Sequence, residues 1–364
     1  MAQETVIMLH RSFFSDRERK IAELGELSAS LFLYDSGVAA LRMENARGQV
    51  TILPFQGQQI WDARFDDRVL AMKSMFTQPH PTREYLATYG GFLIHCGATA
   101  MGVPTKEDSH PLHGELPNAP YDSAFLAIGS DERGPYFALG GEYRHTVAFN
   151  FDYLARPRVK LHAGESLLPV SLEIVNCKKT PMDLMYLAHV NFRPLDNGRL
   201  VYTAPCTPQT VRVRTALPSH IKPPAGHREF LSQLAANPGL HNVLAPGLAF
   251  DPEVVLYLGY RTDTQGWAHS MMVHPDGWAS YIRHRPDQLD HGVRWISRTA
   301  DQDCLGIVLP ATAEPEGYTA EKAKGNVRSL AGGATARFDL EVGLLAPARA
   351  KEMETAIEHI LAGR

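Results

Sequence analysis

The chain has 364 residues, of which 21% are charged, and 36 Lys and Arg against 40 Asp and Glu give a net charge of −4. This near balance argues against a polybasic surface for nucleic acid or membranes. No stretch of 18 uninterrupted apolar residues occurs and the N-terminus lacks a secretory signal pattern, so we expect a cytoplasmic protein without a membrane span. Its four well-separated cysteines are expected to be reduced and mostly buried.

Helical patterns are few along the chain. Residues 15–32 carry apolar side chains at helical spacing, which predicts a helix inside an N-terminal strand-and-helix arm over residues 1–34. Residues 227–239 end in Asn-Pro-Gly and predict a second helix. Residues 348–364 predict a third helix at the C-terminus.

Most of the remaining sequence predicts short strands separated by Gly, Pro, Asn or Asp. The clearest, residues 336–345, alternates apolar and charged side chains. The pattern predicts an all-β fold, a large antiparallel β-sandwich with a few peripheral helices, formed by residues 1–364 as a single domain. The predicted strands cover 48–55, 122–130, 146–155, 166–176, 199–205, 253–262, 277–285, 304–310 and 336–345.

The stretch HPLHGELPN, residues 110–118, is the first candidate for chemistry. In an extended segment His113 and Glu115 would project to the same side, as an acid and a base facing one pocket. Gly114 between them would leave room for a close approach to the backbone. The alternative is an ordinary polar loop.

A second histidine, His189, lies within the apolar run MYLAHVNFRP. A period of two places it on one face with Leu187 and Asn191, and places Tyr186 and Val190 on the other. The interpretation is either a core histidine or one wall of a polar pocket. A further hypothesis is a metal site, with His95, His110 and His113 as ligands and Glu115 as a fourth.

Five stretches follow one another in a characteristic order: ILPFQGQQI, GGFLIHCG, PLHGELPN, YLAHVNFRP and CLGIVLPATAEPEGY. Their order resembles the galactose mutarotase (aldose 1-epimerase) superfamily, and more closely its less characterised, aldose-1-epimerase-related branch. The resemblance covers residues 35–346, and its most specific parts are LHG at 112–114 and HVNF at 189–192. It implies a galactose mutarotase-like super-sandwich that binds a monosaccharide in an open cleft, with no metal and no cofactor.

The implied activity is that of an aldose 1-epimerase, an isomerase that opens and recloses a sugar ring by acid–base catalysis. By resemblance His189 is the acid that protonates the ring oxygen, His113 supports the developing charge, and Asn191 assists. The family's general base, a glutamate, falls at or near Leu309, which cannot accept a proton. Either another carboxylate replaces it, or the alignment is shifted there, or the protein is a catalytically weak sugar-binding or sensor protein.

Further residues are expected at the site. The candidate bases are Glu115, Glu314, Glu316 and the more distant Asp290. Candidates for contacts with the substrate are Arg64, His95, Trp61, Trp278, Trp295, Arg212 and Arg214, the last two as ligands for a phosphate or carboxylate, and His284 and His291 are secondary candidates. The expected partner is a small-molecule sugar or sugar derivative, and both a monomer and a homodimer are compatible with the sequence.

Overall fold

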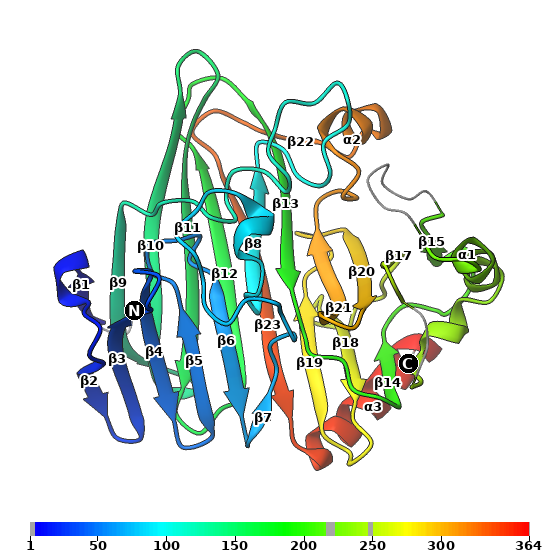
Figure 1. Cartoon of the computed structure of the whole chain (residues 1–364), viewed down its shortest axis with the longest axis horizontal. Coiled ribbons are helices and arrows are strands. Elements are labelled where there is room, and N and C mark those ends of the chain that lie inside the picture. Colours follow the sequence, from blue (N-terminus) through cyan, green and yellow to red (C-terminus); the bar gives the residue numbers. More distant parts are fainter. Residues whose placement is uncertain (1–3, 216–222, 247–249, 364) are drawn as a thin grey trace.

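The computed structural model describes residues 4–215, 223–246 and 250–363. Two large antiparallel sheets pack face to face (Figure 1). The ten-stranded sheet has the order β1-β9-β10-β11-β12-β23-β19-β18-β14-β16, and the thirteen-stranded sheet has the order β15-β17-β20-β21-β13-β8-β6-β5-β4-β3-β2, with β22 and β7 attached to it. The predicted all-β sandwich is therefore confirmed.

The ten-stranded sheet carries the four longest strands among the described residues, β10, β11, β23 and β12. Its strands are β1 (Thr5–Leu9), β9 (Ser123–Asp131), β10 (Gly134–Val147), β11 (Phe151–His162), β12 (Leu167–Asn176), β14 (Gly198–Tyr202), β16 (Val243–Leu244), β18 (Ala268–Val273), β19 (Ala279–His284) and β23 (Thr335–Leu345).

The thirteen-stranded sheet continues from the N-terminal hairpins to the strands around His189. Its strands are β2 (Arg19–Leu24), β3 (Leu27–Leu33), β4 (Ala39–Asn45), β5 (Gly48–Ile52), β6 (Ile60–Phe65), β7 (Arg68–Val69), β8 (Leu93–Ala98), β13 (Met182–Val190), β15 (Val211–Val213), β17 (Val254–Leu258), β20 (His291–Arg298), β21 (Asp303–Ala311) and β22 (Arg328–Leu330).

Helices are short and peripheral. Two of the predicted helices are confirmed, as α1 (His227–Ala236) and α3 (Pro347–Ala362), and α2 (Tyr318–Lys324) follows β21. Helix α3 buries Ala350 and Ile357 against the outer face of the ten-stranded sheet, where Tyr281 lies. Three single turns of 3₁₀ helix also occur among the described residues: η1 (Arg11–Phe13), η2 (Tyr85–Thr88) and η3 (Pro238–His241).

The helix predicted over residues 15–32 is wrong, because β2 and β3 form a hairpin there. The turn is made at Gly25, whose positive φ of 59° suits glycine. After the turn, Leu27, Ala29 and Leu31 are fully buried at every second position, a strand period that outweighs the helical spacing.

The strand predicted over residues 146–155 is also wrong in its bounds. It spans the end of β10, a three-residue turn at 148–150 and the start of β11. At the tip, Phe149 has a positive φ of 68° and projects into solvent, so an apolar residue occupies a turn position here. The sequence pattern counted this phenylalanine as a strand residue.

The main hydrophobic core lies between the two sheets, and β13 shows how the alternation divides it. Tyr186, Ala188 and Val190 are fully buried in the core between the sheets, whereas Leu187 belongs to a separate apolar cluster on the other face of its sheet. The predicted alternation along β13 is therefore confirmed, and His189 lies on the outer face of the thirteen-stranded sheet.

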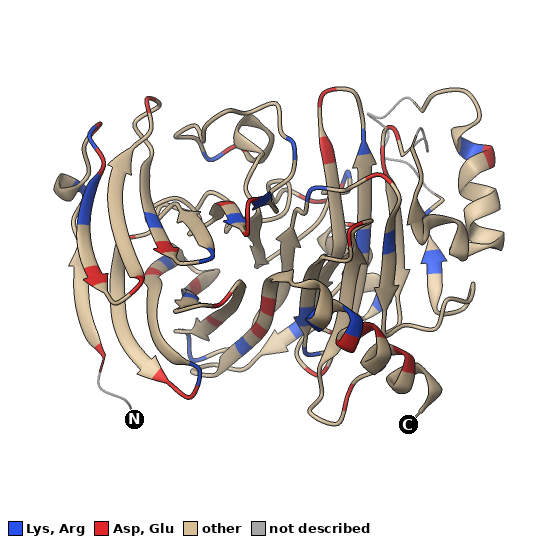
Figure 2. Ribbon diagram, turned by 90° about the horizontal axis from the view of Figure 1, so that it is seen from below, with Lys and Arg blue, Asp and Glu red and all other residues tan. Residues whose placement is uncertain are grey.

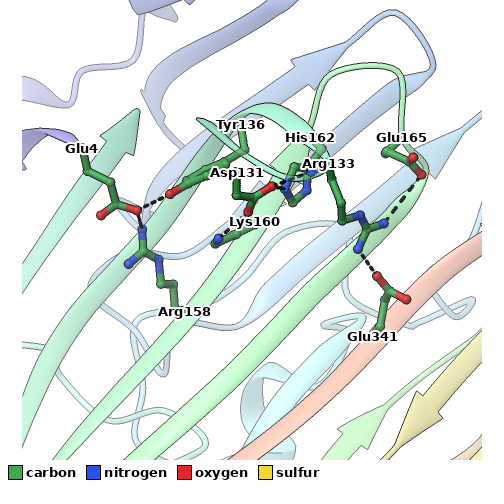
Figure 3. Close-up of polar contacts among 9 residues, drawn as sticks. All are labelled: Glu4, Asp131, Arg133, Tyr136, Arg158, Lys160, His162, Glu165 and Glu341. Atoms are coloured by element: carbon green, nitrogen blue, oxygen red, sulfur yellow. Dashed lines mark hydrogen bonds and ion pairs between the residues drawn. The ribbon is translucent and has the colours of Figure 1, made fainter. Parts of the chain in front are cut away.

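The outer face of the ten-stranded sheet forms a trough of about 810 Å³, lined mostly by charged side chains. Acidic and basic residues lie close together on it (Figure 2): β11 contributes Arg156, Arg158 and Lys160, and β23 contributes Arg337, Asp339 and Glu341. Figure 3 shows how closely they pair: Asp131 accepts hydrogen bonds from Lys160 (2.9 Å) and His162 (3.0 Å), and Arg133 pairs with Glu341.

Of the four cysteines, all free thiols, two are buried and two exposed, which differs from the expectation of mostly buried thiols.

Candidate functional site

A pocket of about 310 Å³ opens on the outer face of the thirteen-stranded sheet. Strands β13, β17, β20 and β21 form its floor, and the segments that precede and follow β8 form its walls. It is lined by Met75, Phe76, Tyr85, Leu86, Tyr89, Val103, Leu112, His113, Leu187, His189, Arg214, Glu253, Val255, Val293, Trp295, Gln302, Leu309 and Pro315. Histidines predicted from two distant motifs therefore meet in one pocket.

His189 is held in one orientation by Asn191, two residues further along the chain. The Nδ1–H group donates to Asn191 Oδ1 at 2.7 Å, and Asn191 Nδ2 donates to the carbonyl of Gly91 at 2.9 Å, which fixes which end of the amide faces the ring. Burial lowers the pKa of His189 to about 4. The neutral imidazole therefore offers the Nε2 lone pair on its pocket side.

His113 reaches the pocket from a tight turn rather than from an extended segment. Its φ is 60° and that of Gly114 is 82°, and the carbonyl of His113 accepts a hydrogen bond from Gly97 N at 2.9 Å. A Cβ atom at position 114 would lie 2.3 Å from the carbonyl oxygen of Ala100, so only glycine fits there. Burial, and then repulsion from His189 and His110, holds the pKa of His113 well below its usual value.

The left-handed turn separates His113 from Glu115, and the prediction that the two project together is wrong. Glu115 is buried on the far side of the turn, where its carboxylate accepts hydrogen bonds from Ala98 N (3.1 Å), Thr99 N (3.0 Å) and Tyr153 Oη (2.6 Å). Glu115 therefore has a structural role at the end of β8. It accepts hydrogen bonds from the backbone N–H groups of Ala98 and Thr99, which would otherwise be buried without partners. It does not line the pocket.

Aromatic rings surround the two histidines. The ring centroids of His113 and His189 are 5.4 Å apart, His189 and Trp295 are also 5.4 Å apart, and Tyr85 lies 4.9 Å from His113. Tyr89 lies 5.9 Å from His189 and donates its hydroxyl to Asn191 Oδ1 at 3.2 Å. The rings keep both histidines in fixed positions.

A β-bulge interrupts the pairing of β20 with β21 beneath the pocket. Val293 pairs with Leu309, but the next pair along is Trp295 with Gly306, so β21 has one extra residue. Val293 and Trp295, two residues apart on β20, share one face of the sheet with Leu309, the partner of Val293, and all three line the pocket. Leucine thus stands in the pocket at the position to which the family resemblance assigns a base.

A carboxylate does line the pocket, and it comes from another strand. Glu253 precedes β17, accepts the indole N–H of Trp295 at 2.7 Å and forms an ion pair with Arg214. Its side chain is 18% exposed. Arg214 also lies 3.6 Å from Glu316, so two carboxylates neutralise this one guanidinium.

The sequence analysis missed Glu253 as a site residue. Its position in DPEVVLYLGY shows only a glutamate before an apolar strand, without any pattern of its own. The signal that finds it is geometric, since β17 is paired with β20 and places Glu253 beside Trp295.

Several predicted site residues lie elsewhere. Glu314 pairs with Arg212 (2.5 Å) and Lys324 (2.7 Å), and Asp290 bonds His291 (2.8 Å), beside a different hollow. Arg64 is exposed and pairs with Asp62 at 2.8 Å.

His95 points to the core side of β8, where its Nδ1 lies 2.8 Å from Tyr186 Oη and burial lowers its pKa to about 4. His110 bonds the carbonyl of Pro111 at 2.8 Å, away from His95. In the part of the chain that the structure describes, no group of three His, Cys, Asp or Glu side chains has a metal-binding arrangement, so His95, His110 and His113 do not form the site of the metal hypothesis. No helix among the described residues is long and apolar enough to cross a bilayer.

Similar solved structures define the class of fold. A candidate aldose 1-epimerase from Klebsiella pneumoniae aligns with a TM-score of 0.78 and 15% identity, over 99% of this chain and 96% of that one. A galactose mutarotase-like protein from Clostridium acetobutylicum aligns with a TM-score of 0.59 and 11% identity, over 88% and 99%. One from Lactobacillus casei aligns with a TM-score of 0.53 and 15% identity, over 84% and 100%. The protein therefore has the galactose mutarotase-like fold.

Within that class, residues 35–344 match the model of a family described as a domain of unknown function, DUF4432, and the chain belongs to this family. No curated protein matches the sequence at a significant level.

Proposed function

We propose that the protein is an aldose 1-epimerase-like isomerase that opens and recloses the ring of a monosaccharide in the pocket around His113 and His189. The observation that carries the proposal is the fixed tautomer of His189, whose Nδ1–H is bound by Asn191 while Nε2 is left for a ligand. A buried histidine with one nitrogen held by a partner is the arrangement that acid–base catalysis needs. The mutarotase-like fold supports the same reading.

Ring opening needs a proton to leave the anomeric hydroxyl and another to reach the ring oxygen. We assign the first transfer to Glu253, the carboxylate that lines the pocket, and the second to protonated His189 through Nε2–H. Asn191 Oδ1 accepts from Nδ1–H in both states of the ring, so it keeps the proton donor aligned throughout. His113 faces His189 and contacts the sugar hydroxyls.

The bond changes balance without a cofactor. The bond from C1 to the ring oxygen breaks, the C1 hydroxyl becomes an aldehyde, and the ring oxygen becomes a hydroxyl. Rotation about the C1–C2 bond presents the other face of the aldehyde, and the reverse transfers close the ring and restore both groups. Trp295, which binds Glu253 and touches His189, offers an apolar edge to the ring of the sugar.

Anomer exchange measured by saturation-transfer NMR tests the proposal. The panel holds neutral aldoses, 6-deoxyhexoses, hexose 6-phosphates and uronates, each with and without the protein. Accelerated exchange on at least one sugar is the expected result. Binding of a sugar without acceleration of exchange on any of them would contradict the enzymatic proposal and favour a sugar-binding protein, for which Leu309 in the pocket would be the reason.

A further inference from the structure

The pocket carries no excess of positive charge. Its lining contains one guanidinium, that of Arg214, and one carboxylate, that of Glu253, and these two form an ion pair. Glu316 lies 3.6 Å from the same guanidinium. Because both flanking histidines are neutral at pH 7, a phosphate or carboxylate on a ligand would find no unpaired cation here. The pocket therefore suits a ligand without charge.

The lining is also more apolar than a sugar with a hydroxyl on every carbon requires. Ten of the 18 lining residues are apolar: Met75, Phe76, Leu86, Val103, Leu112, Leu187, Val255, Val293, Leu309 and Pro315. A hydroxyl placed against such a wall loses its hydrogen bonds to water and gains none in return. A methyl group in the same place is favoured.

The apolar character continues to the mouth of the pocket. Met75 is 68% exposed and Leu86 is 64% exposed, and both line the opening. The segment that carries them is closed by its own hydrogen bonds, from Ser74 Oγ to the carbonyl of Tyr89 (2.6 Å) and from His80 N to Thr88 Oγ1 (2.9 Å). Single exposed apolar residues are common on protein surfaces, but here Met75 and Leu86 lie at the entrance of one pocket. We call these two residues the apolar rim.

We propose that the pocket takes a neutral sugar that carries an apolar substituent, with the 6-deoxyhexoses as the simplest members of this class, and that Met75 and Leu86 contact the substituent. This inference rests on the proposal that the ligand is a sugar. The polar edge of the sugar faces His113, His189 and Glu253, and its methyl group faces the apolar rim.

Binding to matched sugar pairs tests the inference separately from catalysis. Dissociation constants are measured by titration NMR for D-fucose against D-galactose, for L-rhamnose against L-mannose, and for D-glucose 6-phosphate against D-glucose, so that the members of each pair differ only at C6. We expect the better 6-deoxyhexose to bind about tenfold more tightly than its parent hexose, because the two differ only in the C6 hydroxyl, which loses its hydrogen bonds to water against an apolar wall. The phosphate is expected to bind at least tenfold more weakly than glucose.

A Leu86→Gln variant places a polar group of similar length at the rim, and Leu24→Gln, at a 42% exposed leucine on the distant strand β2, is its matched control. The preference for the 6-deoxyhexose should fall to threefold or less in Leu86→Gln and stay unchanged in Leu24→Gln. Retained preference in Leu86→Gln, tighter binding of the phosphate, or no preference in the wild type would overturn the inference.

The exchange measurement keeps the two proposals apart. Accelerated exchange on parent hexoses without preference for 6-deoxyhexoses overturns this inference and leaves the isomerase proposal standing. Preferred binding of a 6-deoxyhexose without exchange supports the inference for a sugar-binding protein and contradicts the isomerase. Failure of every 6-deoxyhexose to bind overturns the inference whatever the other sugars do.

Discussion

The trough on the ten-stranded sheet and the pocket on the thirteen-stranded sheet differ in whether a histidine nitrogen is available to a ligand. The trough on the ten-stranded sheet is larger, about 810 Å³ against about 310 Å³, and much richer in charge. Its histidine, His162, is buried like His189; its Nε2 is bound to Asp131 at 3.0 Å, and its Nδ1 has no partner among the described residues but is buried away from solvent. His189 instead has its Nδ1 bound and its Nε2 on the pocket side. Availability of one atom, rather than volume or charge, marks the candidate site.

The largest expected effect on the rate of anomer exchange comes from replacing the histidine of the pocket, and the histidine of the trough serves as its control. His189→Gln removes the group that we assign to proton transfer, and we expect anomer exchange to slow by about 10²–10⁴-fold. His162→Gln, at an equally buried histidine of the trough, should leave exchange unchanged. Saturation-transfer NMR on the best sugar of the panel gives both rates. Equal losses in the two variants would mean that the effect is one of folding, and an unchanged rate in His189→Gln would refute the assigned acid.

The carboxylates give the second test. Glu253→Gln keeps the size of the side chain but cannot accept a proton, so exchange should slow by about 10²–10³-fold while the sugar still binds. Glu173→Gln, which alters a trough carboxylate paired with Arg337, is the control and should exchange at the wild-type rate. A Glu253→Gln variant with full activity would show that another group takes the anomeric proton.

The pH dependence of exchange sharpens the assignment of His189. With its pKa near 4, only a small fraction of His189 is protonated at pH 7, and that fraction grows about tenfold for each unit of acidification toward pH 5. An acid role therefore predicts exchange that rises as the pH falls over this range. A rate that falls instead would make His189 the base.

The same lowered pKa has a consequence for stability that must be controlled. A histidine whose pKa falls on folding stabilises the protein above its unfolded-state value of about 6.5, and this contribution is lost as the pH drops toward 4. His95, with its pKa also near 4, acts in the same direction. Circular dichroism at each pH should show a falling melting temperature below pH 6.5, and exchange rates are compared only where the protein is folded.

Sequence patterns predicted what depends on alternation and missed what depends on pairing across the sheet. The sandwich, two of the three predicted helices and the face that His189 shares with Leu187 follow from residues that are neighbours in sequence, although the pattern left open whether that face is core or pocket. Glu253 enters the pocket only because β17 pairs with β20, a contact between distant segments. That residues 1–364 form one domain, and the roles of the site residues, stay predictions.

The separation of His113 from Glu115 shows a different limit. Their spacing implies a common face only if the backbone is extended, and the positive φ values of His113 and Gly114 reverse the chain between them. Glycine at 114 was compatible with both readings, because it also allows a ligand to approach. The carbonyl of Ala100, not a ligand, occupies that space.

The smallest expected effects lie within the trough and show why its charge carries little information about function. Lys160 is 26% exposed and pairs with Asp131, which is 31% exposed, so Lys160→Met should lower the free energy of unfolding by less than about 1 kcal/mol. Glu341 is 5% exposed and pairs with both Arg133 and Arg283, so Glu341→Met leaves two half-buried guanidiniums without their shared partner and should cost about 3 kcal/mol.

Urea unfolding of the two variants at pH 7 measures this difference. The order Glu341 above Lys160 follows from burial alone, since water screens the exposed pair and cannot reach the buried one. A larger loss for Lys160→Met would mean that its contacts with Asp131 and with the Tyr136 ring, 4.0 Å from Nζ, are stronger than solvent-screened contacts, and the trough would then have to be considered as a binding surface. If the expected order is found, the ion pairs of the trough stabilise one face of the ten-stranded sheet and need no ligand. The pocket around His189 is then the place where a side-chain nitrogen, Nε2, is available for proton transfer.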